Sequence, residues 1–466
     1  MIVIDKAERD DALLAMVSPS RITPPPPPPP QEQICFSSQQ SSCPSKVIIP
    51  IMHCTDEQYI TYFIDEVSTL LLRNKDSRFA NPYRSHFPDL VISSPLVAGA
   101  MNALGALHLA NTAAVMQQNH HFQRALSKYS EVVRMLRAHF SSPMAHLGIS
   151  EFATCLLLCL FEMMDSQHQN WALHLNGAHE IYNLLFSPHT GTFEREAQRA
   201  TELRHPLRPF LVSLFSYLDV AGARTRPGGT VVNGTYWKAL KSGWEYNLGT
   251  PSLVGIRDDP ALRELRAAWS NMMEVQVSIS RFADDKRWMS SDEQDMIFRK
   301  ILNRLIIWRA SAPLILQILG DMKPDDEHLV QFPFSGMLEY AGRLEAYEKA
   351  TIVHLHQVNR AGRVNFGFGR TCLDKTITRI LSLIRFLSKD TGQLDVLRPL
   401  FIAGQETRKE DEQKYVRETM EHLKRFGFRN VDKSLELLEN LWLKRRMYPE
   451  RWTETVDELY SNILLP

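Results

Sequence analysis

Six cysteines are the residues of this chain best suited to hold a metal, and their spacing decides whether they do. A compact knot in which six thiolates bridge two zinc ions needs closely spaced Cys-x2-Cys pairs. Seven and ten residues separate Cys35, Cys43 and Cys54, and the sequence contains no Cys-x2-Cys pair. Cys155 and Cys159 share one helix face, but the surrounding residues are rich in leucine, so both are predicted to pack in the core. The sequence predicts no metal site.

Other patterns typical of catalysis or cofactor binding are incomplete. His179-Glu180 begins a zinc-protease motif, but Asn183 stands where the second histidine ligand is required. Gly367-Phe368-Gly369 lacks the third glycine of a dinucleotide-binding turn. No nucleophile elbow or phosphate-binding loop is present. The sequence therefore predicts no catalytic residue, leaves any cofactor-binding residue unknown and supports no enzymatic function. The remaining histidine pairs, predicted to lie at the surface or at helix ends, are His120-His121 and His354 with His356.

The charges of the chain do not favour binding to nucleic acid or to a membrane. Lysine and arginine together number 53, as do aspartate and glutamate, so no net charge attracts the chain to either surface. Residues 1–54 hold four basic and five acidic side chains, the wrong balance for an arm that contacts phosphates. No secretory signal opens the chain, and the apolar run Phe152–Phe161 is far shorter than the roughly 20 residues of a membrane helix. We expect a reducing compartment, no membrane contact and no residue in direct contact with DNA.

Two regions of contrasting composition are predicted. Residues 1–54 contain seven consecutive prolines, Pro24–Pro30, followed by a run rich in serine and glutamine. So few apolar residues cannot offset the entropy of ordering, so this head is predicted to be disordered. It is either a solvated tail or a docking segment for a proline-reading domain. Residues 55–466 form the second predicted region, with a Gly/Pro-rich loop insertion at about 225–260.

The apolar residues of the second region recur at helical spacing, without an alternating strand pattern. Thr55 and Gln58 fit a capping box, and Ser94-Pro95 restarts a helix after breaks at Asn81-Pro82 and Phe87-Pro88. The helix from Pro95 is rich in glycine and alanine, which predicts close approach of a neighbouring helix. The predicted fold class is therefore all-α, a large multi-helix domain after a disordered proline-rich segment. Further helices are expected at about 122–140, 149–164, 171–185, 207–220, 261–281, 292–310, 337–358, 374–388, 409–425 and 431–446.

Five groups of short strings occur in a fixed order along the chain. They are Asn81-Pro82-Tyr83-Arg84 with Ser94-Pro95-Leu96; Leu157–Glu162; Trp171-x2-His174-Leu175-x-Gly177-Ala178; Tyr217-Leu218-Asp219-Val220; and Pro399–Glu406 with Trp442. Together they resemble the fungal-specific transcription factor domain, the helical regulatory half of fungal Zn2Cys6 regulators. The resemblance covers about residues 56–450.

The motif residues are predicted to form scaffold. Trp171, Leu175 and Ala178 lie on one stripe of a helix and should pack inward, while Gly177 and Ala178 should let a neighbour approach. Gly404 is expected as a left-handed helix cap after a short turn. The other motif residues are His174, Pro399, Glu406 and Trp442.

The resemblance implies a nuclear transcriptional regulator, with a metabolic or secondary-metabolite gene set as its expected target. The expected partners are other regulators or coregulators, a second copy in a homodimer, or a small-molecule effector. The zinc cluster that reads DNA in this family is missing from the sequence. Either a shortened gene model omits it, or the protein lacks it and acts through partner regulators. The alternative is a helical small-molecule-binding or enzymatic protein that reuses the scaffold; its 17 Met and 22 Phe then line a pocket instead of filling a core.

Overall fold

The structure is a computed structural model, and its described residues are helical wherever they form regular structure. It describes residues 54–71, 81–113, 115–141, 147–166, 170–186, 204–223, 230, 260–322, 336–359, 369–387 and 396–448. Strands are absent from these ranges, so the predicted all-α class is confirmed. The described helices all belong to one compact unit, Thr55–Pro466. Apart from Cys54, Thr230 and Pro260, the predicted head and loop insertion lie outside the described residues.

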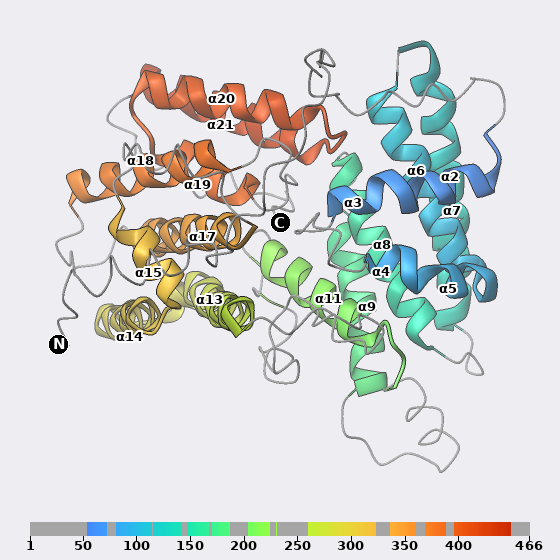
Figure 1. The fold of residues 1–466 in the computed structure, drawn as a ribbon, viewed down its shortest axis with the longest axis horizontal. Helices are drawn as coiled ribbons and strands as arrows, with labels where there is room; N and C mark the ends of the chain where they lie inside the picture. Colours follow the sequence, from blue (N-terminus) through green and yellow to red (C-terminus); the bar gives the residue numbers. More distant parts are fainter. Residues whose placement is uncertain are drawn as a thin grey trace, which may run out of the picture. The chain divides into compact units, whose positions relative to one another are not determined.

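The first group of helices opens with the predicted capping box. Thr55 Oγ1 accepts a hydrogen bond from Gln58 N at 3.3 Å, and Gln58 Oε1 accepts one from Thr55 N at 2.8 Å. Two amides without a helical partner are satisfied in this way. We call this group the N-terminal half (Figure 1); its elements are α2 (Asp56–Tyr62), the π-helical turn η1 (Phe63–Val67), α3 (Ser68–Leu71), α4 (Pro82–Ser85), α5 (Phe87–Ser93), α6 (Pro95–Thr112), α7 (Val115–Ser141), α8 (Ile149–Asp165), α9 (Trp171–Phe186) and α11 (Arg208–Gly222).

The remaining helices form a second group, the C-terminal half. Helix α13 packs against α14 and α17, and α19 packs against α17, α18, α20 and α21. Much of its core consists of buried residues of α17 to α21, including Phe401 and Trp442. Its elements are α13 (Pro260–Asp285), the 3₁₀ turn η2 (Lys286–Trp288), α14 (Ser291–Ala310), α15 (Leu314–Asp321), α17 (Gly336–Val358), α18 (Arg370–Phe386), α19 (Leu397–Glu406), α20 (Glu410–Lys424) and α21 (Asn430–Met447).

Two of the expected helix breaks are helix starts. Asn81 Oδ1 accepts a hydrogen bond from Tyr83 N at 2.9 Å and caps α4, with Pro82 in its first turn. Pro88 lies in the first turn of α5. Proline is tolerated there because the first amides of a helix have no helical acceptor. The predicted breaks are therefore confirmed as helix boundaries, since non-helical Asn81 precedes α4 and His86 separates α4 from α5.

Two histidines predicted at the surface or at helix ends are buried within helices. His121 is 6% exposed inside α7, and its Nδ1 lies 2.9 Å from Tyr59 Oη. His354 is 1% exposed inside α17. The prediction is wrong for both, and at His121 the fold supplies Tyr59 as a hydrogen-bonding partner for the buried ring.

The small residues of α6 allow the close packing that the sequence predicts. A Cβ added at Gly105 would lie 2.2 Å from the Tyr59 carbonyl oxygen of α2. One added at Gly99 would lie 2.6 Å from Val132 Cγ2 of α7. Helix α6 also packs against α8, in which nearly every residue is buried. Glycine in α6 therefore sets the separation of the first helices.

Length and apolarity of the helices bear on membrane crossing. Among the described residues, no single helix is long and apolar enough to span a membrane. Two bent pairs, α5 with α6 and α14 with α15, are together long and apolar enough, by length and composition alone, with bends of 118° and 100°.

Alanine substitution at two helical glycines should have different effects on stability. Gly105→Ala should lower the free energy of unfolding by about 1–3 kcal/mol, because the new methyl group overlaps backbone that cannot move aside cheaply. At Gly177 in α9 the nearest atom to an added Cβ is Cys155 Sγ at 3.4 Å, an ordinary contact. Gly177→Ala should therefore be neutral, or stabilising by up to about 1 kcal/mol through helix propensity. Chemical denaturation of both variants measures this, and equal destabilisation would contradict the packing described.

Candidate functional site

A polar cluster around the buried Glu162 carboxylate, with half-buried partners, lies beside the Trp-x2-His-Leu-x-Gly-Ala motif of α9. It consists of Tyr129 from α7, Glu162 from α8, and Asn170 and His174 at the start of α9; we call it the α7–α9 cluster. Tyr129 Oη donates to Glu162 Oε1 at 2.5 Å and lies 2.8 Å from His174 Nε2. The Asn170 backbone and side-chain amides donate to the Glu162 carboxylate at 3.2 and 3.3 Å. The cluster thereby joins three helices through one carboxylate.

Burial sets the protonation of this cluster. It raises the pKa of Glu162, although the hydrogen bonds from Tyr129 and Asn170 oppose the shift. Burial also raises the pKa of the Tyr129 hydroxyl, and the neighbouring Glu162 carboxylate raises that pKa further. Burial lowers the pKa of His174 to about 4, so the imidazole is neutral at physiological pH. Since the tyrosine proton goes to Glu162, the His174 Nε2–H donates to Tyr129 Oη. The groups satisfy one another, an arrangement suited to holding helices together.

The apolar motif residues of α9 pack inward, as their spacing predicts. Trp171 is 4% exposed, and Leu175 and Ala178 are fully buried. The Trp171 ring lies over Gly222 of α11, where an added Cβ would come within 2.3 Å of ring atom Cζ3. At Gly177 an added Cβ would lie 3.4 Å from Cys155 Sγ of α8, so a neighbour does approach, but the closer approach is that of the Trp171 ring to Gly222.

The two cysteines of α8 lie in the core, as predicted. Burial raises the pKa of Cys155 to about 12 and raises that of Cys159 as well. Cys159 Sγ donates to the Trp171 carbonyl oxygen at 3.5 Å. Thiols that stay protonated are poor nucleophiles and poor metal ligands. Within the described ranges, no three His, Cys, Asp or Glu side chains gather where they could hold a metal ion.

The C-terminal motif forms a second buried site, around α19. Gly404 lies inside this helix and has no left-handed backbone, so its predicted role as a helix cap is wrong. Its carbonyl oxygen accepts a hydrogen bond from Trp442 Nε1 at 2.8 Å. An added Cβ there would lie 2.8 Å from Leu438 Cδ1. Glycine is present because α21 crosses α19 closely at this point.

Buried polar side chains surround the end of α19. Glu406 is 1% exposed, and its Oε1 accepts a hydrogen bond from Gln357 Nε2 at 2.9 Å. Its carbonyl oxygen accepts one from Arg370 at 2.9 Å. Arg445 of α21 is 3% exposed and donates to the Gln405 carbonyl oxygen. Pro399 is buried in the first turn of the helix, where it needs no amide acceptor. These residues cap and anchor α19.

The turn at residues 425–429, between α20 and α21, joins the C-terminal half to the N-terminal half. His108 of α6 lies 3.0 Å from the Phe426 carbonyl oxygen through Nε2 and 2.9 Å from Tyr62 Oη through Nδ1. Asn111 Nδ2 donates to the Gly427 carbonyl oxygen at 2.8 Å. Backbone amide 429 donates to the Met164 carbonyl oxygen of α8 at 3.0 Å. We call this set of contacts the junction.

Backbone geometry and protonation both restrict the junction. Gly427 has a φ of +77°, a left-handed conformation that favours glycine, and an added Cβ would lie 2.7 Å from Thr112 Cγ2. Burial lowers the pKa of His108 to about 4, so its ring is neutral. The Nε2–H then donates to the Phe426 carbonyl, and Nδ1 accepts from Tyr62. A protonated ring would lose the hydrogen bond from Tyr62.

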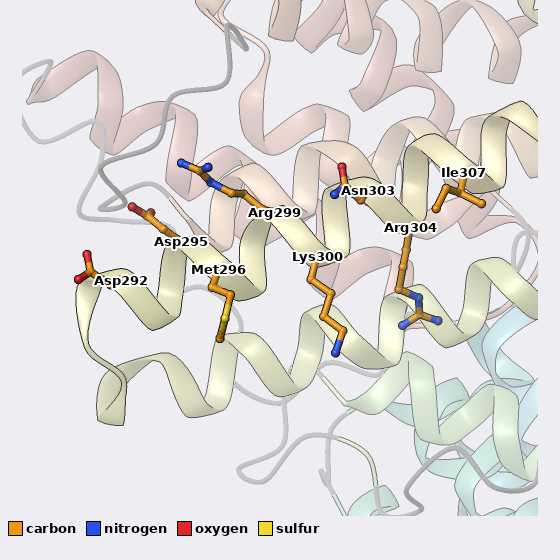
Figure 2. Close-up of a pocket in the computed structure, with 8 residues that line it drawn as sticks. All are labelled: Asp292, Asp295, Met296, Arg299, Lys300, Asn303, Arg304 and Ile307. Atoms are coloured by element: carbon orange, nitrogen blue, oxygen red, sulfur yellow. The ribbon is translucent and has the colours of Figure 1, made fainter. Parts of the chain in front are cut away.

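The surface has two hollows of interest among the described residues. One is an open groove along the outer side of α14, shown in Figure 2. The other, of about 560 Å³, lies among α5, α6, α7 and α8. Neither is lined by the α7–α9 cluster, the α19 site or the junction. The α14 groove is lined by Asp292, Asp295, Met296, Arg299, Lys300, Asn303, Arg304 and Ile307.

The two motif sites and the junction are made of buried groups that bind one another across helices. Such an arrangement defines a helical scaffold whose parts are held in a set relation. The profile of the fungal-specific transcription factor domain matches residues 58–465, nearly the whole described unit. The chain belongs to this family, so its class is that of transcriptional regulators. The predicted resemblance is confirmed. No curated protein and no solved structure gave a significant match.

Sequence reasoning missed the junction and most of the α7–α9 cluster. Glu162 ended a recognised string, but nothing marked Tyr129 as its partner 33 residues away. His108 lies in an apolar helix, where a histidine carries no signal of its contact 318 residues further on. Gly427 was detectable, because a glycine shortly after an amphipathic helix is typical of a left-handed turn.

Replacing His108 should flatten the pH dependence of stability. Between about pH 6.5 and 4 the unfolded histidine binds a proton that the folded one does not, so wild-type stability falls as pH falls. His108→Gln removes this proton uptake and should lower the slope of the free energy of unfolding against pH by about 1.4 kcal/mol per pH unit. Urea denaturation from pH 8 to 5 measures it. The curves should run parallel above pH 7.5, and an unchanged slope below pH 6 would contradict a neutral buried ring.

Proposed function

We propose that this chain is the control domain of a nuclear transcriptional regulator and acts through other regulators or coregulators. The observation that carries the proposal is the extent of the family match, residues 58–465. The chemistry of these groups supports it, because buried Glu162 and Glu406 and half-buried His174 are all held in hydrogen bonds within the fold. We propose no catalytic activity for these side chains.

The junction suggests how such a domain responds to a partner. Turn 425–429 meets α6 and α8 through a few hydrogen bonds, and α11 meets α13 in a limited contact. If the two halves can adopt more than one relative arrangement, a partner that binds one arrangement more tightly shifts the equilibrium toward it. The size of the shift is set by the difference in binding affinity for the arrangements. We infer that a partner regulates this domain by changing the relative arrangement of its two halves.

DNA reading is proposed to lie outside the described helices. A zinc-cluster segment, in a longer form of the protein or in a partner regulator, then selects the target genes, expected to be a metabolic or secondary-metabolite set. The balance of 53 basic and 53 acidic residues supports a domain that is directed to DNA by such a segment.

A tethering experiment tests the regulatory function. The full chain is fused to a heterologous DNA-binding module in a fungal host, and reporter output is compared with that of the module alone at matched protein level. We expect a change of several-fold in either direction, together with recovery of a regulator or coregulator from nuclear extract. An unchanged reporter with no recovered partner would overturn the proposal.

The hollow among α5 to α8 favours a small-molecule effector as a second candidate function. Apolar side chains such as Leu96 and Ile149 line it together with Arg134, His139 and His205. Its volume of about 560 Å³ is in the range of ligand pockets, roughly 300–1,000 Å³. The cationic side chain of Arg134 suits an organic acid.

A thermal-shift screen of small organic acids tests the effector. A true ligand should raise the melting temperature saturably by stabilising the folded state. Arg134→Ala should remove that rise without changing the melting temperature of the free protein, because the Arg134 side chain is not buried. A flat response across the acids, or a rise that survives in the variant, would count against this site.

A further inference from the structure

The outer side of α14 exposes large apolar side chains. Met296 is 62% exposed, Ile306 58% and Ile307 65%, and Trp288 in the turn before the helix is 80% exposed. Single exposed apolar side chains are ordinary on a soluble protein. Several together on one helix and the turn before it are typical of a contact surface.

Charge follows a matching order along the same side. Asp292 and Glu293 stand in the first turn, and Arg299, Lys300 and Arg304 follow. A helix dipole favours acids at the start and bases at the end. It does not account for Lys300 in the middle of α14 or for exposed Met296, whereas Arg304 pairs with Glu274 of α13 at 3.5 Å. Asp292 and Lys300 form no ion pair within the described parts of the chain, so both charges are available.

Several of these charged side chains lie in one row along α14. Asp292, Met296, Lys300 and Arg304 are spaced four apart and form a ridge; Figure 2 shows the last three extending to the same side of α14. Ridges of this spacing align when two helices pack in the commonest way. Asp292 and Lys300 each lie four residues from Met296, in opposite directions.

We propose that the outer side of α14 binds the same surface of a second copy of this chain. The helices run antiparallel about a two-fold axis at Met296. Asp292 of each copy then lies opposite Lys300 of the other, and the two methionines meet at the axis. A two-fold interface makes each contact twice, so one self-complementary ridge supplies two ion pairs.

The size of this surface sets its strength. One helix face buries less than the roughly 1,200 Å² that marks the lower limit of standard interfaces, so the dimer is weak and forms at micromolar concentration or above. Salt should weaken it, because its ion pairs lie at the edge of an exposed surface. The inference goes beyond the regulatory function and does not depend on it.

Charge reversal in the purified full chain tests the proposal by analytical ultracentrifugation. Asp292→Lys alone places two ammonium groups opposite each other at both ends of the interface, and Lys300→Glu alone places two carboxylates there. Each variant should raise the dissociation constant of the dimer at least about tenfold. An equimolar mixture of the two variants should associate again, because both pairs across the axis are then of opposite sign. The double variant should associate with itself for the same reason.

Controls keep the outcome decisive. Lys414→Glu, at an exposed position of α20, should leave the dissociation constant unchanged. Denaturation curves verify that every variant is folded. A monomeric wild type at concentrations on the order of 100 µM would overturn the proposal. So would folded single variants that dimerise like the wild type, or a mixture that fails to associate. A wild type that stays monomeric but captures a helix of another protein would also overturn it. The reporter experiment does not depend on dimerisation in solution, so the two proposals can fail separately.

Discussion

The junction at turn 425–429 is the constraint on which the relation of the two helical halves depends. It requires a left-handed residue at Gly427, where an added Cβ would meet Thr112. It also requires a neutral His108 that donates to the Phe426 carbonyl and accepts from Tyr62. A few hydrogen bonds thus connect helices distant in sequence, and each depends on the correct placement of a buried polar group.

The two motif sites work by the same principle within their own halves. Glu162 accepts from α7 and α9, and the Gly404 carbonyl accepts from α21. In both places a buried acceptor is satisfied only if a neighbouring helix is in position. Leaving such a group unpaired costs about 1–3 kcal/mol, so the family's most recognisable strings mark where helices must meet. His174, a residue type that enzymes also use, is part of such a meeting point through its contact with Tyr129.

Regulation and self-association place different demands on the surface. The buried sites need fixed partners within the chain, whereas the outer side of α14 leaves Asp292 and Lys300 without one among the described residues. A weak, salt-sensitive dimer is suited to a protein whose assembly depends on its concentration. The junction and the α14 surface involve separate contacts within the described unit.

Local pattern determined the helices of this protein, and tertiary packing decided what their polar residues do. The all-α class, the capping box at Thr55 and the inward stripe of Trp171 follow from periodicity and end chemistry, which act over a few residues. The burial of His108 and the close packing at Gly404 depend on helices that only the fold brings near. Because a hydrogen bond between residues 318 apart leaves no local trace, sequence reasoning found the strings but not the contacts.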